Sequence, residues 1–207
     1  MAKGLHHYHR LDVNDPDNDL ALRSVYDNWA THYDRDNDHT LGTVSQPKTV
    51  EILSQVIGTD SSILDAGCGT GLVGHELSKL GFKSFEGIDI SNEMLQHAAA
   101  RGYSHLYQLS LNEPLPLPDN RYDAVISAGL FTHGHVKCHA LLEFVRITKP
   151  GGYICFTVNE GVYQSLGFDQ EIKNIEKAGM WTIKKLHLEP YMTKEGVNAF
   201  YCLAKVC

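Results

Sequence analysis

The sequence predicts an α/β protein with a mainly parallel, doubly wound sheet and helices on both of its faces. From Ser61 onward, short apolar segments that fit strands alternate with amphipathic segments that fit helices, a pattern typical of this fold class. The chain has 207 residues and is 43% hydrophobic, which is enough for one packed domain. We therefore expect a single domain over residues 1–207, with an N-terminal helical segment at 1–45 and the α/β core at 46–207.

The N-terminal segment is predicted to be helical after a polar start. Residues 10–20 indicate a loop that leads into a helix capped near Asp17. The helix carries apolar side chains at helical spacing: Leu20, Leu22, Val25, Tyr26, Trp29 and Tyr33. Residues 34–39 are too polar for a core, and we expect a second helix to begin at Ser45 as its cap. An aromatic face with polar flanks suits a lid over a ligand, or a permanently docked helix.

The remaining elements alternate along the chain. Strands are predicted at 62–64, 85–90, 105–109, 122–127 and 153–158, and two further strands at 181–188 and 199–206 lie close enough to pair. Helices are predicted between these strands, with Ser91 and Asp169 as caps. Ligands of such sheets bind outside the carboxyl ends of the strands, so we expect the functional residues at those ends.

Composition argues against several classes of partner. The formal net charge is −7 and no run of Lys or Arg is present, which disfavours nucleic acid because phosphate neutralisation supplies most of that affinity. No apolar stretch approaches the roughly 20 residues of a membrane span. The five cysteines are scattered without CxxC spacing, so we expect no metal and no disulfide framework. A monomer in the cytoplasm is the expectation, with the nucleus as an alternative.

A glycine-rich loop follows the first strand of the core. It reads Asp65-Ala66-Gly67-Cys68-Gly69-Thr70-Gly71 and opens a helix, so bare backbone can approach a ligand there. With Gly74, the loop also satisfies the GxGxxG pattern of dinucleotide sites. A carboxylate at the mouth of the loop would repel a pyrophosphate and favour an ammonium group. Asp89, at the end of the second strand, is placed for ribose hydroxyls of either cofactor.

The loop and three later segments closely resemble the class I S-adenosylmethionine-dependent methyltransferases. The likeness runs through Ile63–Gly71, Gly87–Ser91, Leu115–Asp123 and Glu143–Gly152, and extends back to Tyr26–Ala30. Within that superfamily the chain is most similar to the Williams–Beuren syndrome chromosome region methyltransferase-like proteins. The resemblance implies a Rossmann-like fold with strand order 3-2-1-4-5-7-6 and strand 7 antiparallel.

The resemblance also implies a set of cofactor-binding residues and the product S-adenosyl-L-homocysteine. The methionine end of S-adenosyl-L-methionine would lie against Asp65, Gly67, Cys68, Gly69 and Gly71. The ribose would bind Asp89, and the adenine would pack on Ile90. Four further residues complete the expected set: Ser110 and Leu111 after the third strand, Ser127 at the end of the fourth, and Tyr33. The aromatic stripe of the N-terminal helix lets Tyr33 either close over the cofactor or pack in the core.

Two departures from the family pattern affect this expectation. The family commonly has an acidic residue after the third strand, near the adenine amino group, whereas this chain has Leu109-Ser110-Leu111-Asn112. Ser110 and the backbone of Leu111 are the natural substitutes. The Asn/Asp-Pro-Pro-Tyr/Phe segment of many amino-group methylases is replaced by Ser127-Ala128-Gly129-Leu130, which makes DNA and protein glutamine less favoured acceptors.

The catalytic apparatus stays open at this point. A sulfonium is already a good leaving group, so alignment of the acceptor can supply much of the acceleration without a base. If there is a base, His133 after the fourth strand is the candidate, and a surface histidine is the alternative. Metal ligation by His133, His135 and His139 lacks a carboxylate partner, so no metal is expected.

The sequence thus predicts a methyltransferase acting on a small-molecule or protein acceptor. Two alternatives remain. One is a nicotinamide-dependent oxidoreductase, because of the GxGxxG pattern; the other is a binding module that holds S-adenosylmethionine without transferring its methyl group.

Overall fold

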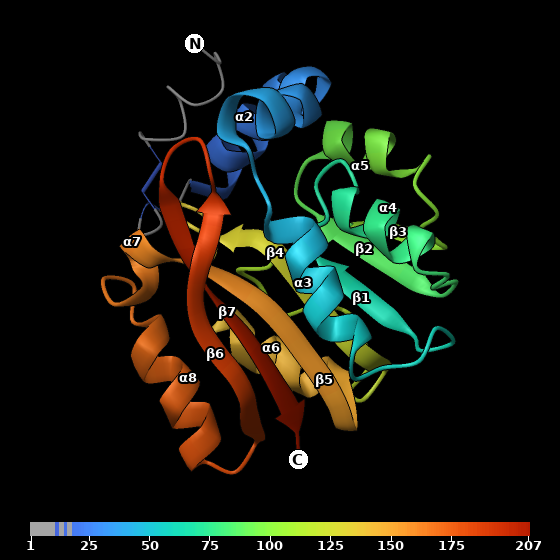
Figure 1. The fold of residues 1–207 in the computed structure, drawn as a ribbon, viewed down its shortest axis with the longest axis vertical. Coiled ribbons are helices and arrows are strands. Elements are labelled where there is room, and N and C mark those ends of the chain that lie inside the picture. The colour runs from blue at the N-terminus through green and yellow to red at the C-terminus, as the bar shows by residue number, and fades with distance from the viewer. Residues whose placement is uncertain (1–10, 13–14, 16–17) are drawn as a thin grey trace.

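A seven-stranded sheet forms the centre of the computed structural model, which describes residues 11–12, 15 and 18–207. The strand order is β3-β2-β1-β4-β5-β7-β6 (Figure 1). Strands β1 to β5 are parallel, and β7 runs antiparallel to both of its neighbours, β5 and β6. The predicted fold class and strand order are confirmed. The strands are β1 Ile63–Ala66, β2 Phe85–Asp89, β3 His105–Gln108, β4 Tyr122–Phe131, β5 Thr148–Asn159, β6 Trp181–Met192 and β7 Val197–Val206.

Helices cover both faces of this sheet (Figure 1). Side chains of α3 and α4 share one buried cluster with strand residues, and side chains of α6 and α8 share another. None of the helices among the described residues is long and apolar enough to cross a membrane. The helical elements are α2 Asn18–Arg35, the π-helical turn η1 Asp36–Leu41, α3 Ser45–Ser54, α4 Leu72–Lys79, α5 Asn92–Ala98, α6 Ala140–Ile147, α7 Glu160–Tyr163 and α8 Phe168–Lys177.

Three local expectations require correction. Asp36 and Asn37 are buried rather than solvated, because Asp36 accepts a hydrogen bond from Trp29 Nε1 (2.9 Å) and Asn37 Nδ2 donates to the carbonyl of Tyr33 (2.9 Å). Ser45 does not cap α3: the cap position is Val44, without a side-chain hydrogen bond.

Asp169 likewise lies inside the first turn of α8, whose cap is Gly167 in the left-handed region. Ser91 is a true cap, since its hydroxyl accepts from the backbone N–H of Met94 (3.1 Å). The predicted cap at Asp17 lies outside the described residues.

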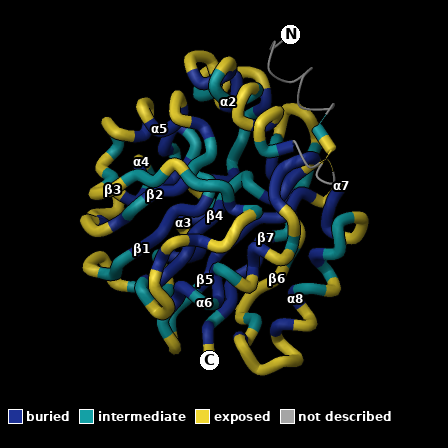
Figure 2. Tube along the Cα trace, turned by 180° about the vertical axis from the view of Figure 1, so that it is seen from behind, coloured by how far each residue is buried: buried dark blue, intermediate teal, exposed yellow. Residues whose placement is uncertain are grey.

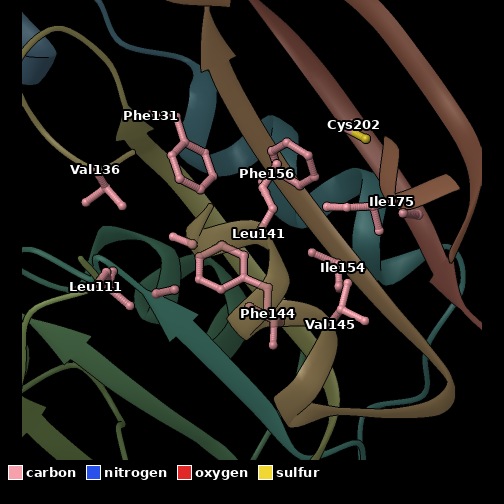
Figure 3. Close-up of a cluster of buried hydrophobic side chains, with 14 of the residues drawn as sticks. Leu111, Phe131, Val136, Leu141, Phe144, Val145, Ile154, Phe156, Ile175 and Cys202 are labelled. Carbon is pink, nitrogen blue, oxygen red and sulfur yellow. The ribbon is translucent and has the colours of Figure 1, made fainter. Parts of the chain in front are cut away.

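Aromatic packing fixes the strands against the helices of one face. The rings of Phe131 on β4 and Phe144 on α6 lie 5.8 Å apart between centroids, and those of Phe131 and Phe156 on β5 are equally close (Figure 3). All three side chains are almost fully buried. Figure 2 shows the same pattern for the described residues, with the central strands buried and many helix surfaces and loops exposed. This rigid core holds the carboxyl ends of β1, β2 and β4 in place.

Candidate cofactor site

The loop after β1 turns tightly and is tied to β2. Gly67, Gly69 and Gly71 all have positive φ values of 77°, 54° and 90°, which residues with a Cβ rarely adopt. The backbone N–H groups of Gly67 and Cys68 both donate to the carbonyl of Ile88, at 2.8 and 2.9 Å. The loop is therefore preformed by backbone geometry.

Gly69 is the loop glycine that is open toward the space above the sheet. A Cβ built on Gly69 would approach no atom closer than Tyr33 Cε1 at 3.9 Å. A Cβ on Gly67 would instead meet Leu130 Cδ1 at 2.7 Å. A ligand can thus reach bare backbone at Gly69, directly under the ring of Tyr33.

The other glycines of the GxGxxG pattern make room for a side chain of the protein itself. A Cβ on Gly71 would lie 2.9 Å from the ring of Tyr103, and one on Gly74 only 2.4 Å from it. A Cβ on Gly87 of β2 would lie 3.0 Å from the same ring. This packing accounts for Gly71 and Gly74 without a dinucleotide.

Tyr103 also holds the carboxyl group of Asp65. Its hydroxyl donates to Asp65 Oδ2 (2.5 Å) and accepts from the N–H of Gly74 (3.0 Å). Asp65 is completely buried, and its Oδ1 has no hydrogen-bond partner. Burial raises the pKa of this carboxyl to about 7, against the lowering effect of the Tyr103 hydrogen bond. Asp65 therefore faces the protein interior rather than the mouth of the loop.

Asp89 lies at the carboxyl end of β2 and lines the pocket above the loop. Its Oδ2 accepts from the N–H of Gly69 (2.8 Å), and its Oδ1 accepts from the N–H of Ser91 (2.9 Å). Burial raises the pKa of Asp89 to about 6, although these backbone donors favour the ionised form. The backbone N–H of Ile90 also contacts this carboxylate, which leaves about one of its roughly four lone-pair sites for a ligand.

A pocket of about 570 Å³, counted with its open mouth, lies between the carboxyl ends of the strands and α2. Its lining contains two carboxylates, from Asp19 and Asp89, and no Lys or Arg among the described residues. Such a pocket favours a cationic ligand and disfavours a pyrophosphate.

Helix α2 roofs this pocket with aromatic side chains. Tyr26 and Tyr33 both line it, with their ring centroids 6.1 Å apart. Burial and the nearby carboxylates of Asp89 and Asp34 raise the pKa of Tyr33 to about 12, so its hydroxyl stays protonated at neutral pH. Trp29, one turn from each, is buried and packs against Tyr33.

Three acidic residues of α2 tie the roof to the loops below. Asp34 accepts from Thr70 Oγ1 (2.5 Å) and pairs with Arg101. Asp27 accepts from Ser91 Oγ (2.6 Å). The third is Asp19, at the other end of the helix, which contacts the segment after β3. The roof is therefore closed in this structure.

The structure divides the predicted binding residues into two groups. Those that line the pocket are Tyr33, Gly67, Gly69, Asp89, Ile90, Ser110 and Leu111. The others lie beneath it: Asp65 and Gly71 contact Tyr103, Cys68 is buried with its Sγ against Gly87, and Ser127 Oγ donates to the carbonyl of Ala66 (2.8 Å). The second group shapes the loop from below.

The histidine that lines the pocket is His135. His133 is exposed and its ring lies beside Gly161, outside the pocket lining. His135 is buried, with Nδ1 2.6 Å from the carbonyl of His133 and Nε2 2.5 Å from the hydroxyl of Tyr26. Burial lowers the pKa of His135 to about 4, so the ring is neutral at physiological pH.

Sequence reasoning did not assign several lining residues to the cofactor site, including Asp19, Leu22, Asn112 and His135. Leu22 and Tyr26 lay on the predicted apolar stripe, which signalled burial without showing what covers it. The position of His135 after the fourth strand placed it near the expected site, but the local sequence did not show which histidine enters the pocket, and nothing around Asp19 indicated a pocket. Among the described residues, no group of three or more His, Cys, Asp or Glu side chains could hold a metal ion.

The donor set fits S-adenosylmethionine. The pocket offers the open backbone of Gly69, the carboxylates of Asp19 and Asp89, and apolar walls from Ile90 and Leu111. A sulfonium, a ribose and a flat heteroaromatic base each find a matching partner there. The residues present therefore suit this cofactor better than a dinucleotide.

Comparisons with known proteins agree with this geometry. Residues 64–156 match a family model described as a methyltransferase domain. The human "Methyltransferase-like protein 27" is 39% identical over 172 residues, covering 79% of this chain and 69% of that protein. The malonyl-[acyl-carrier protein] O-methyltransferase of Serratia marcescens is 32% identical, covering 75% of this chain and 59% of that protein.

A solved structure of another methyltransferase shows the same fold. It is the magnesium protoporphyrin IX methyltransferase of Synechocystis with bound S-adenosylmethionine, with a TM-score of 0.69 and 16% identity over 94% of this chain and 99% of that one. A second structure of that enzyme holds S-adenosylhomocysteine. Domain and relatives together lead to one conclusion: this chain belongs to the methyltransferases, as a relative of human methyltransferase-like protein 27.

Proposed function

We propose that the protein transfers a methyl group from S-adenosylmethionine to a small-molecule or protein acceptor, and that the cofactor occupies the pocket under α2. The observation that carries the proposal is the charge of the lining: two carboxylates and, among the described residues, no cation. This is the electrostatic environment that a sulfonium and an ammonium group require.

Each part of the pocket has a defined task in this proposal. Asp89 accepts a hydrogen bond from a ribose hydroxyl, while also holding the N–H of Gly69 in place (2.8 Å). The backbone at Gly69 approaches the methionine part, and Tyr33 covers it from above. The carboxyl of Asp65, beneath the loop, adds negative potential when ionised.

The cofactor, when bound, supplies an electrophilic methyl group on a good leaving group. The chain itself has to orient the acceptor and exclude water. Tyr26 and the neutral ring of His135 form a hydrogen-bonded pair in the lining (2.5 Å). His133, which is exposed, stays a prediction as a base.

The names of the relatives indicate which acceptor atoms to test first. Bacterial malonyl-[acyl-carrier protein] O-methyltransferases are 32% and 34% identical to this chain. We therefore place oxygen acceptors, on small molecules or on groups carried by proteins, at the head of the candidates. The lack of Lys and Arg in the described lining gives an anionic polynucleotide no counter-charge there.

A transfer assay with methyl-labelled S-adenosylmethionine over metabolite and protein pools tests the proposal. We expect one acceptor class to gain label with the wild type and to lose it with Asp89→Ala. Lys205→Ala, on β7 away from the pocket lining, is the control. Cofactor binding without label in any pool would show a binding module instead of an enzyme.

A further inference from the structure

Asp19 reaches the pocket from the first turn of α2. One carboxylate oxygen accepts from the hydroxyl of Ser110, and the other accepts from Asn112 Nδ2 (2.9 Å). Ser110 and Asn112 follow β3, more than 90 residues further along the chain. They belong to the segment 109–112 after β3, which contains no acidic residue.

The position of Asp19 along the pocket follows from the sheet. The carboxyl ends of β1, β2 and β3 are neighbours in that order, so the pocket runs from Gly69 past Asp89 to Ser110. Adjacent strands lie about 4.8 Å apart. With the methionine part at Gly69 and the ribose on Asp89, as proposed above, a ligand that continues in the same direction places its base over the end of β3.

The walls at that end suit a flat base. Ile90, Leu109, Leu111 and Val136 line this part of the pocket with aliphatic side chains. Apolar walls accept the faces of an aromatic ring, whereas its polar edge needs donors and acceptors. Among these lining groups, the carboxylate of Asp19 is the charged acceptor.

We propose that Asp19 accepts a hydrogen bond from the exocyclic amino group of the cofactor's adenine. This inference rests on the cofactor occupying the pocket under α2. An ionised carboxylate has about four lone-pair sites, and Ser110 and Asn112 use one on each oxygen. Base recognition is thereby supplied by the N-terminal helix rather than by the segment after β3.

Asn112 has a fixed orientation that supports this role. Its Oδ1 accepts from the N–H of Lys137 (3.1 Å), which directs its Nδ2 toward Asp19 and toward the carbonyl of His135 (3.2 Å). The side chain therefore acts as a positioning residue that presents the Asp19 carboxylate to the pocket. A simple surface contact would need no such arrangement.

The other acidic residues that tie α2 to the core differ from Asp19 in one respect. Asp27 and Asp34 make comparable contacts with Ser91 and Thr70, but neither lines the pocket. Asp27 thus offers a matched control: it has the same side chain, on the same helix, with the same kind of tethering contact. Loss of either tether weakens closure of the roof, but only loss of Asp19 changes the preference for the adenine amino group.

The test compares S-adenosylhomocysteine with S-inosylhomocysteine, in which an oxo group replaces the amino group. Calorimetry measures both affinities for the wild type, Asp19→Asn and Asp27→Asn. We expect the wild type to prefer the adenosyl ligand by roughly 10- to 100-fold, the effect of one hydrogen bond to a charged group. Asp19→Asn should lose most of this preference because an amide can donate to the oxo group. Asp27→Asn should keep it.

The ratio of the two affinities separates the outcomes. Because both ligands bind the same variant, any loosening of α2 cancels in that ratio. A wild type without preference, or an Asp19→Asn variant that weakens both ligands equally, overturns the role of Asp19. A wild type that binds neither ligand, or full binding by Asp89→Ala, overturns instead the placement of the cofactor in this pocket.

Discussion

Tyr103 explains why the loop after β1 needs glycine at positions that the sequence assigns to a ligand. Its ring fills the space that Cβ atoms at Gly71 and Gly74 would occupy, and its hydroxyl holds the buried carboxyl of Asp65. The loop is therefore shaped from below by Tyr103 and left open above at Gly69. Gly71 and Gly74 thus make room for Tyr103, whereas Gly69 leaves room for a ligand.

Replacement of Gly69 by Val should abolish S-adenosylmethionine binding. The branched side chain would fill the open space under Tyr33, and the φ of 54° adds strain. Gly179→Val is the matched control, since Gly179 has a φ of 71° with no atom within 4 Å of a built Cβ, and it lies outside the pocket lining. Calorimetry should show binding for the control alone. Normal binding by Gly69→Val would mean that the loop does not hold the cofactor.

Replacement of Tyr103 by Phe should destabilise the fold by about 1–3 kcal/mol, the cost of a buried polar group without its partner. The pKa of Asp65 is raised from 3.8 to about 7, so its contribution to stability is present below about pH 4 and is lost as the pH rises through 7. The Tyr103 hydrogen bond lowers this pKa, and its removal raises it further. The variant should therefore lose more stability at about pH 8 than at about pH 5.

Urea unfolding of the wild type and Tyr103→Phe at the two pH values measures this difference. Tyr107→Phe removes a hydroxyl bonded to Glu86 and leaves Asp65 untouched, so it controls for the loss of a tyrosine hydroxyl. Equal costs of Tyr103→Phe at both pH values would contradict a role for Asp65 ionisation.

At the scale of elements, α2 closes the pocket from a position outside the α/β core. Its two ends are tied by Asp19 and Asp34, and its centre by the contact of Tyr26 with His135. These contacts are polar, and although Leu22, Trp29 and Ala30 are buried, α2 adds no side chain to the two large apolar clusters that join the strands to the helices of the two faces. Polar tethers of this kind open at a lower free energy than a packed core.

Hydrogen exchange with and without S-adenosylhomocysteine tests whether α2 acts as a lid. We expect protection of residues 26–40 to rise strongly on binding, because the ligand would join the roof to the loops. The amides of β4 and β5 serve as the internal reference. Equally slow exchange of 26–40 in both states would identify α2 as a permanent part of the core.

At the scale of the whole molecule, the cofactor should stabilise the fold by mass action. S-adenosylmethionine at 100 times its dissociation constant should raise the free energy of unfolding by about 2.7 kcal/mol. NAD should produce no shift, because its pyrophosphate would meet the carboxylates of Asp19 and Asp89. Thermal unfolding with each ligand measures this. A shift of the unfolding transition with NAD and none with S-adenosylmethionine would contradict the proposal that the pocket binds S-adenosylmethionine.

The sequence by itself determined the order of the elements and the edge of the sheet where the pocket lies. Alternating apolar periods predicted the strands and helices, and the glycine loop with Asp89 marked the ends of β1 and β2, because these signals are local in the chain. The seven-stranded order followed from resemblance to a family, not from spacing.

Tertiary structure alone decided which side chains face the pocket. Asp65 points inward because Tyr103, 38 residues later, packs under the loop, and His135 rather than His133 lines the pocket beside Tyr26, 109 residues earlier. Asp19 joins a segment 91 residues away. Such contacts depend on how α2 and the loop after β4 pack across the sheet. Because the partners lie far apart in the chain, no periodic pattern in the sequence shows which way these side chains point.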